Sequence, residues 1–217
     1  MLAKNDDVKR MRAGAMMGIV GVIVLVDAIV AAQTEQAATE LRPPSSFASI
    51  QDGRERSITL FGEAGKVIQH PRCINCHPAG DHPLQGNDEH PHVPAVARGP
   101  EDMGAPGAYC TACHREDNVT LLAAPHTSIP GHPRWQLAPH EMAWQDMTLG
   151  AICEQLKDPE RNGHRTLAEL HEHMAEDDLV GWGWHPGAGR APAPGTQALF
   201  GELIQAWIDT GAVCPPR

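Results

Sequence analysis

The chain carries the five-residue pattern C-x-x-C-H twice, and this repetition constrains its fold more than any other feature. The first copy runs from Cys73 to His77 and the second from Cys110 to His114. In c-type haem attachment, two thiols so spaced form thioether bonds to one porphyrin, and the histidine that follows ligates the iron. The sequence therefore predicts two covalently bound haem c groups. The expected attachment residues are Cys73, Cys76, Cys110 and Cys113, and the expected proximal iron ligands are His77 and His114.

Two other chemistries also use paired cysteines. Two C-x-x-C pairs can build a four-thiolate zinc site, and a single pair can act as a redox dithiol. Neither alternative explains why a histidine follows the second cysteine in both copies. An exported chain also suits haem attachment better than a structural zinc site. Haem attachment is therefore the favoured interpretation.

The composition is that of a chain with many loops and few large side chains. Of its 217 residues, 21 are Gly and 19 are Pro, and only 4% are aromatic. Two buried macrocycles would supply the missing apolar bulk, so we expect a mainly α domain with extensive irregular loops, folded around its haems. The formal net charge of −10 argues against nucleic acid as a partner and favours a redox protein with a basic docking patch.

The N-terminal segment is typical of an exported protein. Basic residues within 1–12 precede an apolar run at 13–26, which Asp27 interrupts before more small and apolar residues. This pattern predicts a secretory signal peptide or an uncleaved membrane anchor at 1–32, and hence a periplasmic protein. In the uncleaved case the protein would contact the membrane only through this segment. The Gln, Thr, Ser and Pro content of 33–56 indicates a linker, which leaves 57–217 as the haem domain.

Helical signals flank long irregular stretches in this domain. An apolar face predicts a helix from Ser57 that ends before His70-Pro71. The segments between and after the haem motifs, 78–109 and 115–147, show no clear period. Later helices are expected after Thr148, after the capping-box pattern that begins at Thr166, and along the apolar stripe at 199–208, with Gly211 as its C-cap.

Six cysteines minus four haem-bound ones leave Cys153 and Cys214. In an exported protein, two remaining thiols most simply form one disulfide. It would join the 149–157 helix to the C-terminal tail. The alternative is a pair of separate buried thiols.

The second axial ligand of each iron decides the function. A histidine or methionine there closes the iron and favours electron transfer, whereas an open position permits catalysis. Two candidates are His70, which lies close to the first motif, and Met142, which lies in an irregular stretch. On the 166–176 helix, the apolar periodicity places His171 nearer the buried side than His173. Periodicity alone would therefore choose His171.

Three strings carry a resemblance to a known family: His70 to Pro78, Arg98-Gly99-Pro100, and Asp177 to Trp184. They resemble small exported dihaem cytochromes c, the cytochrome-like subunits that accompany periplasmic oxidoreductases, some of them named after isoquinoline oxidoreductase. The resemblance runs from about residue 57 to 215. It implies a distal ligand four positions before Asp177, which is His173, and another before the Arg-Gly-Pro string, which matches His92.

These observations predict a periplasmic dihaem electron carrier between a dehydrogenase or membrane redox complex and an acceptor, with no catalytic residue. One alternative is a haem enzyme with an open iron that reduces peroxide or a nitrogen oxide. Another is a haem-bearing structural or sensory subunit of a larger complex.

Overall fold

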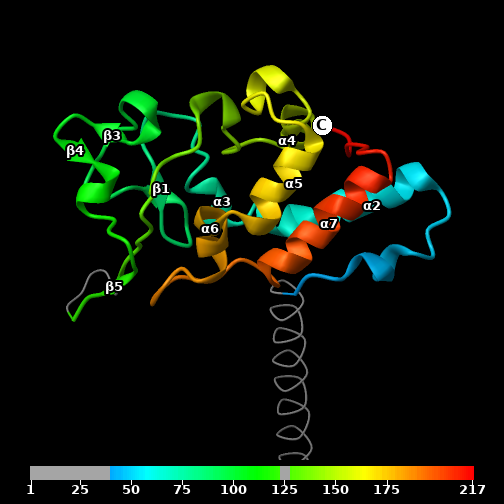
Figure 1. Ribbon diagram of the computed structural model, residues 1–217, viewed down its shortest axis with the longest axis horizontal. Helices are drawn as coiled ribbons and strands as arrows, with labels where there is room; N and C mark the ends of the chain where they lie inside the picture. The colour runs from blue at the N-terminus through cyan, green and yellow to red at the C-terminus, as the bar shows by residue number, and fades with distance from the viewer. Residues whose placement is uncertain (1–39, 123–127) are drawn as a thin grey trace, which may run out of the picture. The chain divides into compact units, whose positions relative to one another are not determined.

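Three helices carry most of the hydrophobic core. The computed structural model describes residues 40–122 and 128–217, so the predicted signal or anchor at 1–32 lies outside the described residues. Helix α2 (Gly53–Ile68) and helix α5 (Leu167–Glu176) both pack against α7 (Gln197–Asp209). Figure 1 shows these helices side by side, with the small strands at the opposite side of the folded unit. Within the described residues the protein is mainly helical and has no closed sheet.

The remaining elements are short. The other α-helices are α3 (Pro71–Ile74), α4 (Leu149–Leu156) and α6 (Asp178–Gly181). Single turns of 3-10 helix are η1 (Pro44–Phe47), η2 (Pro100–Asp102), η3 (Cys110–Ala112), η4 (His140–Met142), η5 (Pro159–Arg161) and η6 (Trp182–Trp184). Three antiparallel pairs of two-residue strands connect them: β1 (Leu84–Gln85) with β2 (His90–Pro91), β3 (Gly104–Ala105) with β4 (Ala108–Tyr109), and β5 (Val119–Thr120) with β6 (Ser128–Ile129).

Side-chain caps start the predicted helices. Thr148 caps α4 by accepting from Ala151 N, and Asp158, the second residue after α4, precedes Pro159 as expected. Thr166 and Glu169 form the predicted capping box of α5, which ends at Glu176. These hydrogen bonds satisfy N–H groups that have no partner within the helix. Because they join residues close together in the chain, the sequence alone predicts where the helices begin.

Two boundaries differ from the sequence predictions. Helix α2 begins at Gly53 rather than Ser57, because Asp52 caps it by accepting from Glu55 N. The folded unit begins at Leu41, so the linker predicted at 33–56 is wrong for residues 41–56. Leu41 and Phe47 are buried in the core, which explains why this proline-containing segment is fixed.

The ends of the domain are also tied to the core. Phe61 of α2 packs on Trp207 of α7, with ring centroids 4.8 Å apart. An added Cβ at Gly201 would lie 2.5 Å from the Cβ of Ala175, so glycine permits the close approach of α7 to α5. The C-cap of α7 is Thr210, whereas Gly211 was expected at that position. Gly211 is the next residue and has a φ of 101°.

The predicted disulfide is present. Cys153 and Cys214 have their sulfur atoms 2.07 Å apart and are 61 residues apart in the chain. The bond joins α4 to the C-terminal tail. Among the described residues, no helix has the length and hydropathy needed to cross a bilayer.

Candidate haem-binding sites

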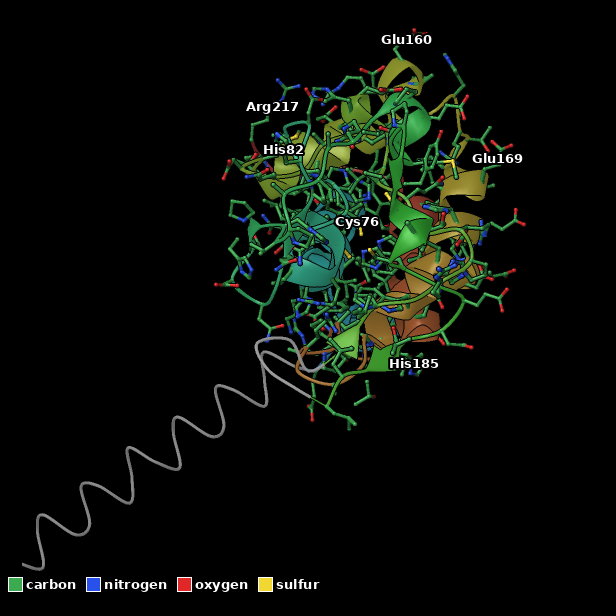
Figure 2. All side chains as sticks on the ribbon, turned by 90° about the vertical axis from the view of Figure 1, so that its left-hand side faces the viewer. Cys76, His82, Glu160, Glu169, His185 and Arg217 are labelled. Atoms are coloured by element: carbon green, nitrogen blue, oxygen red, sulfur yellow. A yellow bond between two sulfur atoms is a disulfide. The ribbon has the colours of Figure 1, made fainter. Side chains whose placement is uncertain are left out.

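The first C-x-x-C-H motif lines an enclosed cavity. His70 ends the connection from α2 and caps α3 by accepting from Arg72 N at 3.2 Å. The turn that follows brings Cys73, Cys76 and His77 to the wall of one cavity. Cys76 lies toward the middle of the folded unit in Figure 2, whereas His185 lies at its edge. The cavity is partly open to solvent and has a volume of about 180 Å³.

The wall of this cavity is mostly apolar. It includes aliphatic and aromatic side chains from α2, α4, α5, α6, η6, α7 and the loops on both sides of η4. These are Ile68, Leu137, Leu156, Leu170, Leu179, Val180, Phe200, Trp135, Trp144, Trp182 and Trp184. An apolar wall with a few convergent polar groups is what a macrocycle needs.

His77 is held in one orientation. Its Nδ1 lies 2.7 Å from the carbonyl oxygen of Met142. Because a carbonyl can only accept, Nδ1 carries the proton and Nε2 keeps its lone pair for a metal. The ring stacks on Trp144, with centroids 3.7 Å apart and planes 6° apart. Trp144 is fixed in turn, because its Nε1 donates to Gln155 Oε1 at 2.7 Å.

His114 repeats this arrangement in the second motif. Its Nδ1 donates to the carbonyl oxygen of Pro130 at 2.8 Å. Its ring stacks on Trp135, with centroids 4.6 Å apart and planes 9° apart. Trp182 packs edge-on against Trp135 and supports it from the other side. Both proximal histidines therefore present a free Nε2 on a ring that is fixed by a carbonyl and an indole.

Burial keeps both rings neutral. It lowers the pKa of His77 to about 4 and the pKa of His114 to about 4. A metal-binding imidazole must be neutral, so both histidines are in the form that ligates iron at neutral pH.

His173 is the histidine that the structure brings to His77. It lines the same cavity, and repulsion between the two rings adds to the burial that lowers the pKa of His77. His171, which periodicity favours, lies elsewhere: it lines a surface groove with Pro43 and Pro44. The apolar stripe of α5 contacts both α7 and the cavity, and His171 lies on the α7 side.

His92 faces His114 across the second motif. The ring centroids are 6.0 Å apart and the planes are inclined by 64°. A separation of this size leaves room for one metal ion between the two imidazoles, because a metal–nitrogen bond is about 2 Å long. His92 Nδ1 donates to the carbonyl oxygen of Pro94 at 2.8 Å, so its Nε2 is also free.

The two remaining distal candidates are His70 and Met142, and hydrogen bonds fix the His70 ring and the Met142 carbonyl. His70 uses Nδ1 to cap α3, and it is absent from the cavity wall. Met142 does line the cavity, but its carbonyl binds the Nδ1 edge of His77, the edge opposite to Nε2. The structure thus groups His77 with His173 and His114 with His92.

The thiols do not resemble a redox dithiol. Burial raises the pKa of Cys73 to about 12 and the pKa of Cys76 to about 11, whereas reactive dithiols have lowered pKa values. Within residues 40–122 and 128–217, no three His, Cys, Asp or Glu side chains form a metal-binding group. The four-thiolate zinc arrangement is therefore not one that the described residues make.

Two arginines lie between the motifs without an acidic partner at bonding distance. Arg72 is only 4% exposed and donates to Gly86 O and Asn87 Oδ1, while its buried Nε has no hydrogen-bond partner. Arg190 donates to Ser128 and Pro186 O, which are neutral groups. Burial and the positive charge of Arg190 both lower the pKa of Arg72. Buried cations normally pair with an anion, and haem propionates would supply one here.

Exposed apolar side chains gather around the second motif. Among the described residues, the large hydrophobic side chains that are exposed all lie between positions 93 and 122: Val93, Met103, Tyr109, Val119 and Leu122. Cys113 is also exposed. The second motif is therefore more exposed than the first, whose residues line a cavity.

Sequence reasoning missed the groups that fix the proximal rings. No sequence pattern gave Trp135 or Trp144 a role, yet they stack on the histidines of the two motifs. An available signal was the excess of Trp over Phe and Tyr in a chain with 4% aromatic residues. In comparisons with known proteins, the chain matches no family model, no curated protein and no solved structure.

Proposed function

We propose that the protein is an exported dihaem c-type cytochrome that carries electrons between redox partners. The observation that carries the proposal is that two C-x-x-C-H motifs hold their histidines in the same way. Each Nδ1 donates to a main-chain carbonyl and each ring stacks on a tryptophan, which leaves both Nε2 atoms free. Hydrogen bonds of this kind orient metal-binding histidines and raise their basicity.

Attachment needs only the thiols of the chain. Each S–H adds across a vinyl C=C of the porphyrin: the S–C bond forms at one carbon and the hydrogen goes to the other. No atom leaves and no external oxidant is consumed. Cys73 and Cys76 would hold one group, and Cys110 and Cys113 the other.

When bound, haem c supplies one-electron chemistry between ferrous and ferric iron. The residues that would hold the iron are His77 and His173 in the first site and His114 and His92 in the second. Two histidines available at each site favour electron transfer over peroxide or nitrogen-oxide reduction. The apolar cavity excludes water from the first site, and Arg72 offers a positive charge to propionates.

The two sites adjoin each other. Trp135 lines the cavity of the first motif and also stacks on His114 of the second. Electrons would therefore pass from one haem to the other within the domain. The second site, surrounded by exposed apolar side chains, is the one that a redox partner would reach. The net charge of −10 favours a partner with a basic docking surface.

Spectroscopy and mass measurement of the full chain test this proposal. The protein would be produced in a host that attaches haem c and then purified. We expect a mass increased by two haems, low-spin spectra for both irons and no binding of carbon monoxide. Replacing Cys73 and Cys76 by Ala should remove one haem and keep the other. A protein without a Soret band would refute the proposal, and carbon monoxide binding to the intact protein would favour an enzyme.

A further inference from the structure

One of the four histidines in the two sites faces a carboxylate. His173 Nδ1 lies 3.4 Å from Asp177 Oδ2, one helical turn along α5. The Nδ1 atoms of His77, His114 and His92 all bind main-chain carbonyls instead. The first site is therefore distinguished from the second by a negative charge on its distal ligand.

Asp177 is held in place by other contacts. Its Oδ1 accepts from Leu179 N at 2.8 Å, which caps α6, and from Arg134 at 3.1 Å. Its side chain is 20% exposed, whereas the neighbouring Asp178 is 72% exposed. Asp178 also pairs with Arg134 and with His132, but not with His173. The carboxylate thus faces His173 with its position fixed by a backbone donor and an arginine.

We propose that Asp177 is a positioning residue that orients His173 and lowers the reduction potential of the haem in the enclosed cavity. This inference rests on the proposed function. A carboxylate beside Nδ1–H favours the tautomer that leaves Nε2 free for the metal, and its charge makes the imidazole a stronger donor. A stronger donor and a nearby negative charge both stabilise ferric over ferrous iron.

The substitution Asp177→Asn tests the charge while keeping an oxygen that can cap α6 and accept from His173. Spectroelectrochemical titration should resolve two haems, and the midpoint potential of one should rise. We expect up to a tenfold change in its reduction equilibrium constant, which is about 59 mV for one electron. The electron paramagnetic resonance signal of the same haem should shift, while the other haem keeps its potential and signal.

Asp178→Asn is the matched control, because it removes the same negative charge at the next residue, and Asp178 pairs with the same arginine. It should leave both potentials as in the parent. Arg134→Gln provides a second variant of opposite sign: it removes the cation that offsets Asp177 and should lower the potential of the same haem.

The outcomes separate this inference from the proposed function. Equal potential shifts in Asp177→Asn and Asp178→Asn would show that only the net charge matters, and would overturn the inference. Unchanged potentials in both variants would also overturn it. If Asp177→Asn does not fold, a potential that does not fall in Arg134→Gln overturns it instead. Absence of haem from the parent would refute the proposed function itself.

Discussion

The imidazole of His77 lies flat on the indole of Trp144, with ring centroids 3.7 Å and planes 6° apart. His114 stands in the same relation to Trp135. Each pair joins a C-x-x-C-H histidine to a tryptophan much later in the chain, so the loops after the second motif complete both sites. The indoles restrict ring rotation, and the carbonyls of Met142 and Pro130 select the tautomer.

Removing the distal ligands should change the spin state of one haem at a time. His173→Ala and His92→Ala each withdraw one imidazole that faces a proximal histidine, so each should give one high-spin and one low-spin haem with both groups still attached. Absorption and magnetic resonance spectra measure this. His171→Ala is the control on the same helix, because His171 lies outside the cavity. Two low-spin haems in His173→Ala and His92→Ala would show that other ligands are used.

Local signals in the sequence located the helices and the disulfide but could not choose between His171 and His173. The caps at Thr148 and Thr166 are hydrogen bonds within four residues, so the sequence alone predicts them. The apolar stripe of α5, by contrast, contacts both α7 and the cavity. Periodicity marks the side on which Leu170 and Met174 are buried, but it cannot tell which part of that side meets the cavity and which meets α7.

Long-range contacts were also beyond reach. The start of the fold at Leu41 depends on packing against α7 and its surroundings, which no local pattern reveals. The loop carbonyls that bind His77 and His114 have no side-chain signature at all. The C-x-x-C-H residues stand out in the sequence because haem attachment requires a fixed spacing, whereas the groups that orient their histidines can come from any point in the chain.

Loss of Arg72 should lower the potential of the enclosed haem. Arg72→Gln removes a buried positive charge from the cavity wall while a side-chain amide can still donate to Gly86 O. Loss of that charge stabilises ferric iron relative to ferrous iron, so the midpoint potential of this haem should fall. Redox titration of the variant measures the shift. Arg54→Gln, at an exposed position near the start of α2, should leave both potentials unchanged.

The disulfide should stabilise the fold without affecting the haems. Replacing Cys153 and Cys214 together by Ser opens a loop of 61 residues, and the chain-entropy model assigns such a loop about 4 kcal/mol. Chemical denaturation followed by far-ultraviolet circular dichroism should show this loss. The haem content and spectrum should match the parent. A reduced haem content in the double variant would instead indicate that the bond is needed for attachment.

The stabilisation that Glu63 contributes should be lost in acid. Its side chain is 2% exposed and binds Arg42 and Lys66 at 2.8 and 2.7 Å. Burial alone would raise the pKa of this carboxyl, but the hydrogen bonds from Lys66 and Arg42 outweigh it and lower the pKa below the ordinary value. A lowered pKa means that the unfolded state binds the proton more readily. The stabilisation is therefore complete above the unfolded value, near pH 4.5, and is lost as the pH falls through the lower folded value.

Glu63→Gln removes this contribution, so the variant should lose about 1–3 kcal/mol at neutral pH. The difference from the parent should narrow as the pH falls below about 5, because the parent then loses what the variant already lacks. Denaturation curves at several pH values measure both quantities. Glu55→Gln, an exposed substitution on the same helix, should follow the parent throughout. A Glu63→Gln penalty that stays constant from pH 7 to pH 3 would mean that the packing of the side chain, and not its charge, stabilises this end of α2.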